Sequence, residues 1–218
     1  MNHTTLLAID TSTSFLRLAA QFGSDRLVKS NERADRSHGQ MIVRQISNIL
    51  DSGGVAVDKV GVVVVCVGPG SFTGLRVGIA VAKGMAVALD IPIIGVSLFE
   101  VAYRLLGDRA GDALAVIPHR RGEYFAAPIV KSVGPDTVRV VTESNLPELA
   151  AGYHLVGLGL GDKEVSLVEP LEYDAGDLAQ IGADRLEAGL TDSVETLEPL
   201  YFGKSQAEMK FEQRHSKG

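Results

Sequence analysis

The feature that most limits the possible folds is a strand, a glycine-rich turn, a helix and a second strand that follow one another near the middle of the chain. Residues 62–67 are a run of valines interrupted only by Cys66, which is typical of a strand covered on both faces. A helix is predicted over Phe72–Leu89 and a second strand over 91–96. A helical crossover of this kind joins parallel strands, so the sequence predicts an α/β fold.

The segment before this unit predicts an antiparallel meander followed by a helix. Short apolar runs at 5–9, 16–22 and 26–30 are separated by turn-forming residues. Ser37 and Gln40 have the spacing of a capping box, which predicts a helix over 37–50. Its apolar residues recur at helical spacing and give it one hydrophobic face; they are Ile42, Ile46, Ile49 and Leu50.

The second half of the chain also predicts strands and helices, but with weaker sequence patterns. Ser97 is placed to cap a helix that begins with Leu98. Further strands are predicted near 113–117, 124–130, 138–141 and 154–158, and a helix over 177–190. We therefore expect two small α/β lobes, with residues 1–108 forming the first and residues 109–218 the smaller second.

The glycine-rich turn at 68–74 was compared with two phosphate-binding motifs. A P-loop requires Lys and then Ser or Thr directly after its last glycine, and Gly74 is followed by Leu75. A dinucleotide fingerprint requires its third glycine three residues after the second, whereas Gly74 comes four after Gly70. A tight strand-to-helix turn with close packing behind it remains the simpler interpretation.

The helix after the turn is unusually poor in side chains. Gly74, Gly78 and Gly84 each cost about 1 kcal/mol relative to Ala in a helix interior, so close packing must compensate. The small residues fall in two rows, one of Gly74, Gly78, Ala82 and Ala86 and the other of Ala80, Gly84 and Ala88. Spacing alone leaves open which row packs inside the chain and which meets a partner's helix.

Composition excludes several classes of protein. The 21 Lys and Arg against 27 Asp and Glu give a net charge of −6, so the surface offers no general attraction for nucleic acid. No apolar stretch reaches the roughly 20 residues that span a bilayer. The N-terminus has no basic residue before its short apolar run, unlike a signal peptide. We expect a cytoplasmic protein that does not contact the membrane.

Few residues are candidates for catalysis or for binding a metal or a cofactor. Cys66 lies inside a predicted buried strand, and the 5 histidines have no zinc-ligand spacing, so we expect neither a metal nor a cofactor. Asp10, Thr11 and Ser12 end the first strand. In a nucleotide site such residues hold hydrated magnesium and a phosphate, although the same residues also make an ordinary hairpin turn.

Several segments together resemble one family. They are LLAIDTSTS at 6–14, GPGSFTGLRVGIAVAKGMA at 68–86 and IPIIGVSLFEVA at 91–102, with RSHGQ at 36–40, HRRGEYFAA at 119–127 and EPLYF at 198–202. These resemble the TsaB family, also called YeaZ. The central block is specific, whereas AIDTS is shared with many actin-like ATPases. The resemblance implies an actin-like, ribonuclease H-like (ASKHA) fold of two lobes with mixed sheets.

The resemblance also implies a function. Members act as non-catalytic scaffold subunits required for threonylcarbamoyl modification of adenosine in tRNA. They pair with TsaD as a heterodimer, bind the ATPase TsaE, form homodimers in isolation and meet tRNA only through the complex. No catalytic residue is then expected. The implied interface lies on the first two helices, with Ser37, His38, Ile42, Ile46, Phe72, Thr73, Arg76, Val77, Gly78 and Ala82 as its residues.

Two departures from the family pattern and two alternative functions remain. Many members have Asp where this chain has Pro118, and Arg where it has Gly203, which puts any nucleotide site at those positions in doubt.

The first alternative function is an ATP-dependent phosphotransferase that uses Asp10. Its second phosphate loop could only be residues 157–162, whose sequence lacks the required order. The second is a metalloprotease, which the histidine spacing disfavours.

Overall fold

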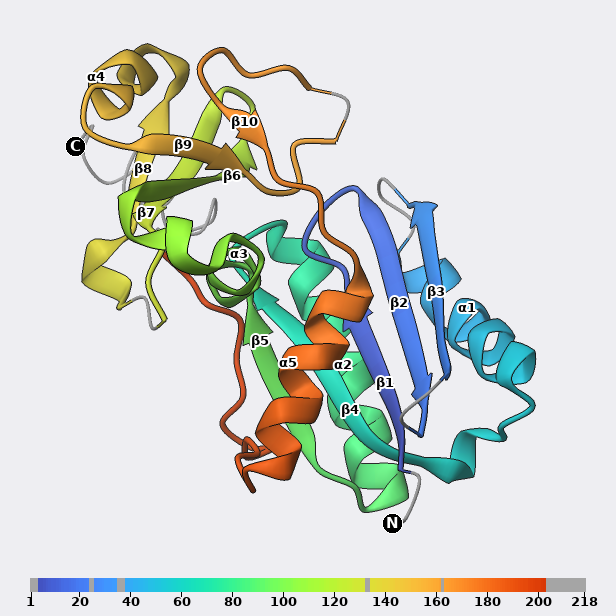
Figure 1. The fold of residues 1–218 in the computed structure, drawn as a ribbon. Helices are drawn as coiled ribbons and strands as arrows, with labels where there is room; N and C mark the ends of the chain where they lie inside the picture. The colour runs from blue at the N-terminus through green and yellow to red at the C-terminus, as the bar shows by residue number, and fades with distance from the viewer. Residues whose placement is uncertain (1–3, 24–25, 35–37, 132–133, 162, 203–218) are drawn as a thin grey trace, which may run out of the picture.

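The computed structural model describes residues 4–23, 26–34, 38–131, 134–161 and 163–202, which form two lobes (Figure 1). The first lobe contains a five-stranded sheet in the order β3-β2-β1-β4-β5. Its strands are β1 (Thr5–Asp10), β2 (Phe15–Phe22), β3 (Arg26–Arg33), β4 (Val60–Gly68) and β5 (Ile93–Ser97). Strands β1 to β3 are an antiparallel meander, and β4 and β5 run parallel to β1. Both the predicted meander and the predicted parallel unit are confirmed.

Helices cover both faces of this sheet. Helices α1 (His38–Gly53) and α2 (Phe72–Leu89) lie on one face, and α3 (Leu98–Leu106) and α5 (Ala175–Glu187) belong to the core on the other (Figure 1). Alternate residues of β4 enter the two cores, with Val63 and Val65 on the α2 side and Val64 and Cys66 on the α5 side. The valine run is apolar throughout because neither face of β4 meets water.

The second lobe repeats the plan of the first. Its sheet has the order β10-β9-β6-β7-β8. The strands are β6 (Ala113–Arg120), β7 (Glu123–Pro128), β8 (Arg139–Thr142), β9 (His154–Gly157) and β10 (Glu169–Pro170). Strands β6 to β8 form an antiparallel meander, and β9 and β10 run parallel to β6. Short helical segments connect its strands: α4 (Leu146–Ala150) and the 3₁₀ turns η3 (Pro135–Thr137) and η4 (Glu143–Asn145). Two further 3₁₀ turns lie before β4 and before β6; they are η1 (Val57–Lys59) and η2 (Gly107–Asp112).

Two sheets with the same strand order and the same directions are the mark of the actin-like, ribonuclease H-like fold, and this expectation is confirmed. The expected division at residue 108 separates the strands of the two sheets but not the helices. Helix α5, from the second half of the sequence, packs against β1, β2, β4 and β5 of the first lobe. Beyond it, Asp192 N donates to Ile93 O (2.9 Å) and Leu200 N to Val67 O (2.8 Å), so the chain follows the first sheet towards the gap between the lobes.

The structure decides which small-residue row of α2 faces the interior. The row that begins with Gly74 and Gly78 is buried, and a Cβ atom at Gly78 would overlap Thr11 Oγ1. The other row is exposed, and no described atom lies within 4 Å of a Cβ atom built at Gly84. Two predicted interface residues are therefore wrong as surface contacts, because Gly78 and Ala82 pack inside the chain.

The same correction applies to α1. Ile42 and Ile46 lie in the core beneath α1, together with Ile49 and Leu50, so they offer no surface to a partner. The apolar spacing that predicted this face is satisfied within the chain. Ser37 lies outside the described residues, as does the side chain of His38.

Helix α2 also has an exposed apolar side. Its length and composition would allow it to cross a membrane, and 33% of it is buried within the described structure. The core helix of a globular protein can have the same length and apolar composition, and the buried row of α2 packs on the sheet as such a helix does. Its exposed positions after the first turn and a half have no polar side chain; they are Ala80, Gly84, Val87 and Ala88.

The two rows predict opposite effects of adding one methyl group to α2. We expect Gly78→Ala to lower the free energy of unfolding by about 1–3 kcal/mol, because the new Cβ atom overlaps Thr11. We expect Gly84→Ala to raise it by up to about 1 kcal/mol, because Ala is the better helix former and space is free. Urea denaturation followed by circular dichroism at low protein concentration measures both; a reversed order would contradict the assignment of the rows.

Candidate functional site

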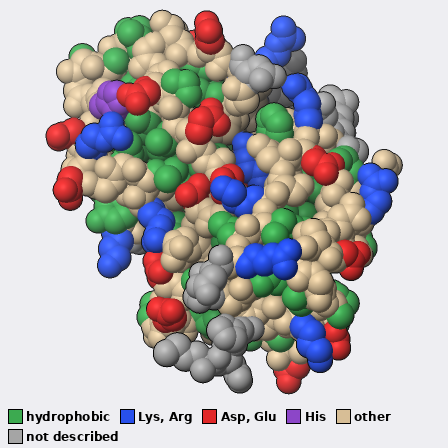
Figure 2. Space-filling view, turned by 45° about the vertical axis from the view of Figure 1, so that its right-hand side comes forward, with side chains coloured by type: hydrophobic (Ala, Val, Ile, Leu, Met, Phe, Trp, Pro, Cys, Tyr) green, Lys and Arg blue, Asp and Glu red, His purple; other side chains and the backbone are tan. Residues whose placement is uncertain are grey.

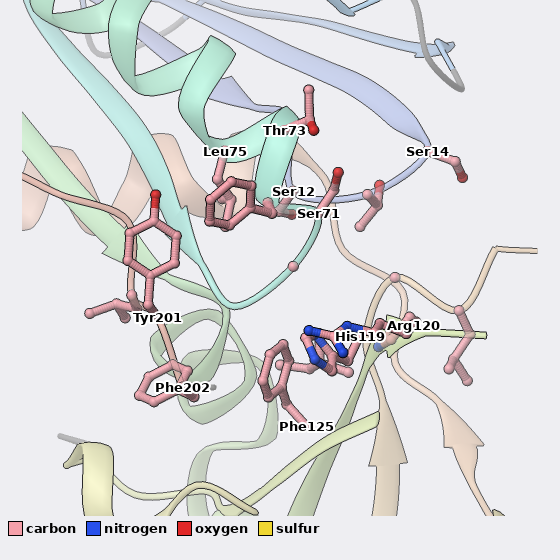
Figure 3. Close-up of a pocket in the computed structure, with 18 of the residues that line it drawn as sticks. Ser12, Ser14, Ser71, Thr73, Leu75, His119, Arg120, Phe125, Tyr201 and Phe202 are labelled. Carbon is pink, nitrogen blue, oxygen red and sulfur yellow. The ribbon is translucent and has the colours of Figure 1, made fainter. Parts of the chain in front are cut away.

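A cavity with a volume of about 880 Å³ lies between the lobes (Figure 3). Three regions form its walls: the loop after β1 with the start of α2, the ends of β6 and β9 with Phe125, and the C-terminal segment at 200–202. Its lining residues are Ser12, Thr13, Ser14, Arg33, Gly70, Ser71, Phe72, Thr73, Leu75, Arg76, Ile117, Pro118, His119, Arg120, Phe125, Gly159, Leu160, Lys163, Leu200, Tyr201 and Phe202.

The glycine-rich turn holds the start of α2 against the loop after β1. Ser71 N donates to Ser12 O (2.7 Å), and Thr11 Oγ1 donates to Gly74 O (2.8 Å). A Cβ atom at Gly70 would overlap Ser12 O, and one at Gly74 would overlap Thr11 O. Glycine is needed here because the two backbones are in contact. The interpretation of this segment as a tight, closely packed turn is confirmed.

Asp10 is fully buried and surrounded by donors from its own lobe. Its carboxylate accepts hydrogen bonds from Ser12 N (2.8 Å) and from the Tyr173 hydroxyl (2.9 Å), and it forms an ion pair with Arg17 Nη1 (3.4 Å). The same Arg17 nitrogen donates to Thr13 Oγ1 (2.7 Å). The Arg17 guanidinium thus balances the charge of Asp10 inside the protein, because a buried carboxylate generally needs such a partner.

Tyr173 completes this buried group from the segment that leads into α5. Burial, and then the charge of Asp10, raises the pKa of Tyr173 well above its ordinary value, so its hydroxyl remains protonated and donates to the carboxylate. The Arg17 guanidinium lies 4.5 Å from the centre of the Tyr173 ring. Of the three candidate cofactor-binding residues, Ser12 lines the cavity, whereas Asp10 and Thr11 lie behind its wall.

The cavity has a charge unlike that of the rest of the surface. Arg33, Arg76, Arg120 and Lys163 line it, and the described lining residues include no Asp or Glu. Elsewhere, Figure 2 shows basic and acidic side chains interspersed over one face of the molecule. The sequence analysis missed this cluster because its members come from separate elements. Their only local signal was the pair of arginines in HRRG at 119–122.

Aromatic side chains form one side of the cavity. His119 is half-buried and lies against Phe125, with 4.2 Å between ring centres. Burial, and then the charge of Arg120, lowers the pKa of His119, so the ring is neutral at pH 7. At the mouth, the Arg76 guanidinium lies 4.0 Å from the Phe72 ring centre, and its Nε donates to the Tyr201 hydroxyl (2.9 Å).

Among the described residues, neither the cysteine nor any cluster of metal-ligating side chains forms a second candidate site. Cys66 is completely buried, and burial raises the pKa of its thiol well above the ordinary value, so the thiolate needed for nucleophilic attack does not form. Among the residues that the structure describes, no group of three or more His, Cys, Asp and Glu is placed to hold a metal ion.

The predicted interface residues whose side chains the structure describes fall into two groups. Phe72, Thr73 and Arg76 are exposed and Val77 is half-buried, whereas the four corrected positions lie in the core. The sequence analysis missed Val87, which is 69% exposed on α2, and Val43, which is 68% exposed on α1. We call four of the exposed positions of α2 its outer face; they are Ala80, Gly84, Val87 and Ala88, and they lie C-terminal to the exposed Phe72, Thr73 and Arg76.

Comparisons with known proteins give one family and its relatives. Residues 30–113 match the family model described as TsaD, tRNA N6-adenosine threonylcarbamoyltransferase. The tRNA threonylcarbamoyladenosine biosynthesis protein TsaB of Escherichia coli is 32% identical, over 93% of this chain and 96% of that protein. The protein of the same name from Bacillus subtilis is 34% identical, over 56% of this chain and 53% of that protein.

Two solved structures from Pseudomonas aeruginosa agree with this assignment. One, described as an uncharacterized protein with similarity to peptidase YeaZ, has a TM-score of 0.70 at 26% identity and covers 92% of this chain and 100% of that one. The other, YeaZ, has a TM-score of 0.67 at 26% identity and covers 91% and 99%. With about a third of its residues identical to those of a TsaB protein over nearly the full length of both, the chain belongs to the TsaB family.

Proposed function

We propose that this chain is a non-catalytic cytoplasmic subunit required for the biosynthesis of threonylcarbamoyladenosine in tRNA, and that it acts by holding a TsaD-type subunit. The observation that carries the proposal is the exposed, apolar outer face of α2 on a chain whose Asp10 is engaged internally. The assignment to this pathway rests on membership of the family, since TsaB proteins are named for threonylcarbamoyladenosine biosynthesis.

The outer face of α2 fits another helix better than it fits water. Val87 exposes an apolar side chain, and Ala80 and Gly84 leave the backbone bare, which permits close approach of a second helix. An exposed apolar strip of this kind costs free energy unless a partner covers it. Val43 extends the strip onto the neighbouring α1.

The match to the TsaD family supports the identity of the partner. It covers residues 30–113, which include both α1 and α2. Two related subunits that present equivalent helices can pack about a pseudo-twofold axis, and two copies of this chain would do so with true twofold symmetry. The proposal therefore includes a heterodimer with TsaD, a homodimer in isolation, and TsaE docked on the heterodimer.

Contact with tRNA is assigned to the assembled complex. The net charge of −6 gives the isolated chain little attraction for a phosphate backbone, so partner surfaces must supply most of it.

The two enzymatic alternatives find less support. A phosphotransferase would need Asp10 to face a metal in the cleft, whereas its carboxylate is held by Arg17 and Tyr173. Peptidase chemistry, suggested by the description of one relative, would need a nucleophile or metal ligands, and Cys66 is buried with a raised pKa.

Loss of the protein is expected to abolish threonylcarbamoyladenosine in tRNA. We predict that its depletion removes the modified nucleoside, because the modifying subunit lacks its scaffold, and that a plasmid-borne copy restores it. Mass spectrometry of digested tRNA measures both. Unchanged modification in a cell without a second copy of the subunit would refute the assignment to this pathway.

A charge placed on the outer face of α2 should disrupt assembly without unfolding the chain. We predict that Val87→Glu weakens binding to TsaD, and self-association, by about tenfold or more, because the carboxylate is buried against apolar surface. Val140→Glu on β8 is the matched control, since Val140 is also exposed, at 46%, but lies on the second lobe.

Calorimetric titration with TsaD and analytical ultracentrifugation give the two affinities, and melting curves report folding. If Val87→Glu and Gly84→Arg both bind as tightly as Val140→Glu, the interface lies elsewhere.

We predict that Asp10 stabilises the fold and has no part in ATP turnover. We expect Asp10→Asn to lower the free energy of unfolding by about 3–5 kcal/mol, because it leaves the Arg17 charge buried and unpaired. Replacing Arg17 with Met in the same protein should recover much of this loss. Urea denaturation measures stability, and the wild-type chain should release phosphate from ATP no faster than buffer. ATP turnover that Asp10→Asn abolishes would favour the phosphotransferase.

A further inference from the structure

The segment that follows α5 links the outside of the first lobe to the second lobe. Residues 192–202, which we call the strap, run beside β5 towards the gap between the lobes (Figure 1). Near its start Asp192 pairs with Ile93 of β5, and near its end Leu200 N donates to Val67 O of β4 (2.8 Å). Both ends are thus held by core strands, which fixes the path of the strap and the position of the two residues that follow Leu200.

Both residues after Leu200 are aromatic, and the first of them contacts the start of α2. The Tyr201 hydroxyl accepts a hydrogen bond from Arg76 Nε (2.9 Å), and the Tyr201 ring centre is 5.2 Å from that of Phe72. The Arg76 guanidinium also lies 4.0 Å from the Phe72 ring centre. All three side chains are exposed, and we call them the surface cluster. A protein bound at the start of α2 can therefore reach the strap.

The second aromatic residue contacts both lobes. Phe202 meets Phe99 of α3 and Phe125 of β7 edge to face, with 5.9 Å and 6.0 Å between ring centres. It packs against a core that the two lobes share, since that core contains residues of β4 and of β6. Figure 3 shows the Tyr201 and Phe202 rings on opposite sides of the strap. The strap thus places one ring in the surface cluster and the next in the contact between the lobes.

The surface cluster lies at the N-terminal end of the outer face of α2. Arg76 precedes Ala80 by four residues and Ala80 precedes Gly84 by four, so the three positions share one side of the helix. A helix packed along the outer face reaches Arg76 one turn beyond Ala80, and with it the Tyr201 ring. Arginine and tyrosine are common among the residues that contribute most to protein interfaces.

We propose that the strap couples the outer face of α2 to the second lobe. A protein that covers the surface cluster holds Tyr201 in place, and because Phe202 is the next residue of the same backbone, it also holds the Phe202 ring between the lobes. The coupling is reciprocal, so the free energy by which the partner stabilises the second lobe equals the free energy that the docked strap adds to partner binding. The inference rests on the proposed function for the identity of that partner, a TsaD-type subunit, and adds a route by which its binding stabilises the other lobe.

Hydrogen exchange of the isolated chain, measured by mass spectrometry, tests the strap without a partner. Arg76→Ala removes the hydrogen bond that holds Tyr201 to α2. It should speed the exchange of the β6 and β7 amide groups by about fivefold or more, although Arg76 lies on the other lobe. Arg44→Ala is the matched control, because it removes an exposed arginine from α1 of the same lobe. Equal exchange rates in the two variants would overturn the inference.

Addition of a saturating TsaD-type subunit tests the coupling itself. In the wild-type chain it should slow the exchange of the same amide groups by about fivefold or more, and Phe202→Ala should abolish this slowing. Phe22→Ala is the matched control and should leave the slowing intact, since Phe22 is also half-buried but lies opposite Thr5 at the start of β1. Melting curves report folding. If Phe202→Ala does not fold, Phe202→Leu replaces it, because leucine keeps an apolar side chain and removes the ring contacts.

Calorimetric titration of the wild-type chain separates this inference from the proposed function. If the TsaD-type subunit does not bind, the proposed function is wrong, and the comparison of Arg76→Ala with Arg44→Ala decides on the strap. If it binds but leaves exchange in β6 and β7 unchanged, the proposed function stands and the coupling is wrong. Slowing that persists in the Phe202 variant would also contradict the coupling, since the effect then reaches the second lobe by another path.

Discussion

The contact between the loop after β1 and the start of α2 organises the first lobe and one wall of the cleft. The two backbones are in contact there, since Ser71 N donates to Ser12 O at 2.7 Å and neither Gly70 nor Gly74 has room for a Cβ atom. Each glycine weakens an isolated helix, so α2 depends on this packing for its stability. The contact also fixes where the helix begins, and with it both the direction of its dipole and the orientation of its outer face.

Behind this contact, Asp10 is buried and is held by Arg17 and Tyr173. A buried ion pair adds little net stability but makes the loss of either partner costly. Arg17 lies opposite Asp10 on the neighbouring strand β2, and Tyr173 comes from the segment before α5, so the group joins the first hairpin to that segment.

Two surfaces of opposite character follow from this arrangement. The outer face of α2 is apolar, and an unpartnered apolar helix face favours association with another protein. The cleft is lined by basic side chains and bordered by aromatic rings. The two surfaces meet near Phe72 and Arg76, whose side chains stack at 4.0 Å and contact Tyr201 of the strap.

The sequence by itself determined the elements whose signals are local. The valine run predicted a strand covered on both faces, the spacing of α2 gave its bounds as Phe72–Leu89, and Ser97 was identified as a helix cap. Only the tertiary structure decided that Gly78 faces inward and Gly84 outward, because spacing assigns residues to a row without stating what the row packs against. Likewise, the contact of Asp10 with Tyr173 and the basic lining of the cleft depend on residues far apart in the chain. No local pattern contains them, because such contacts exist only once the sheets and helices have packed.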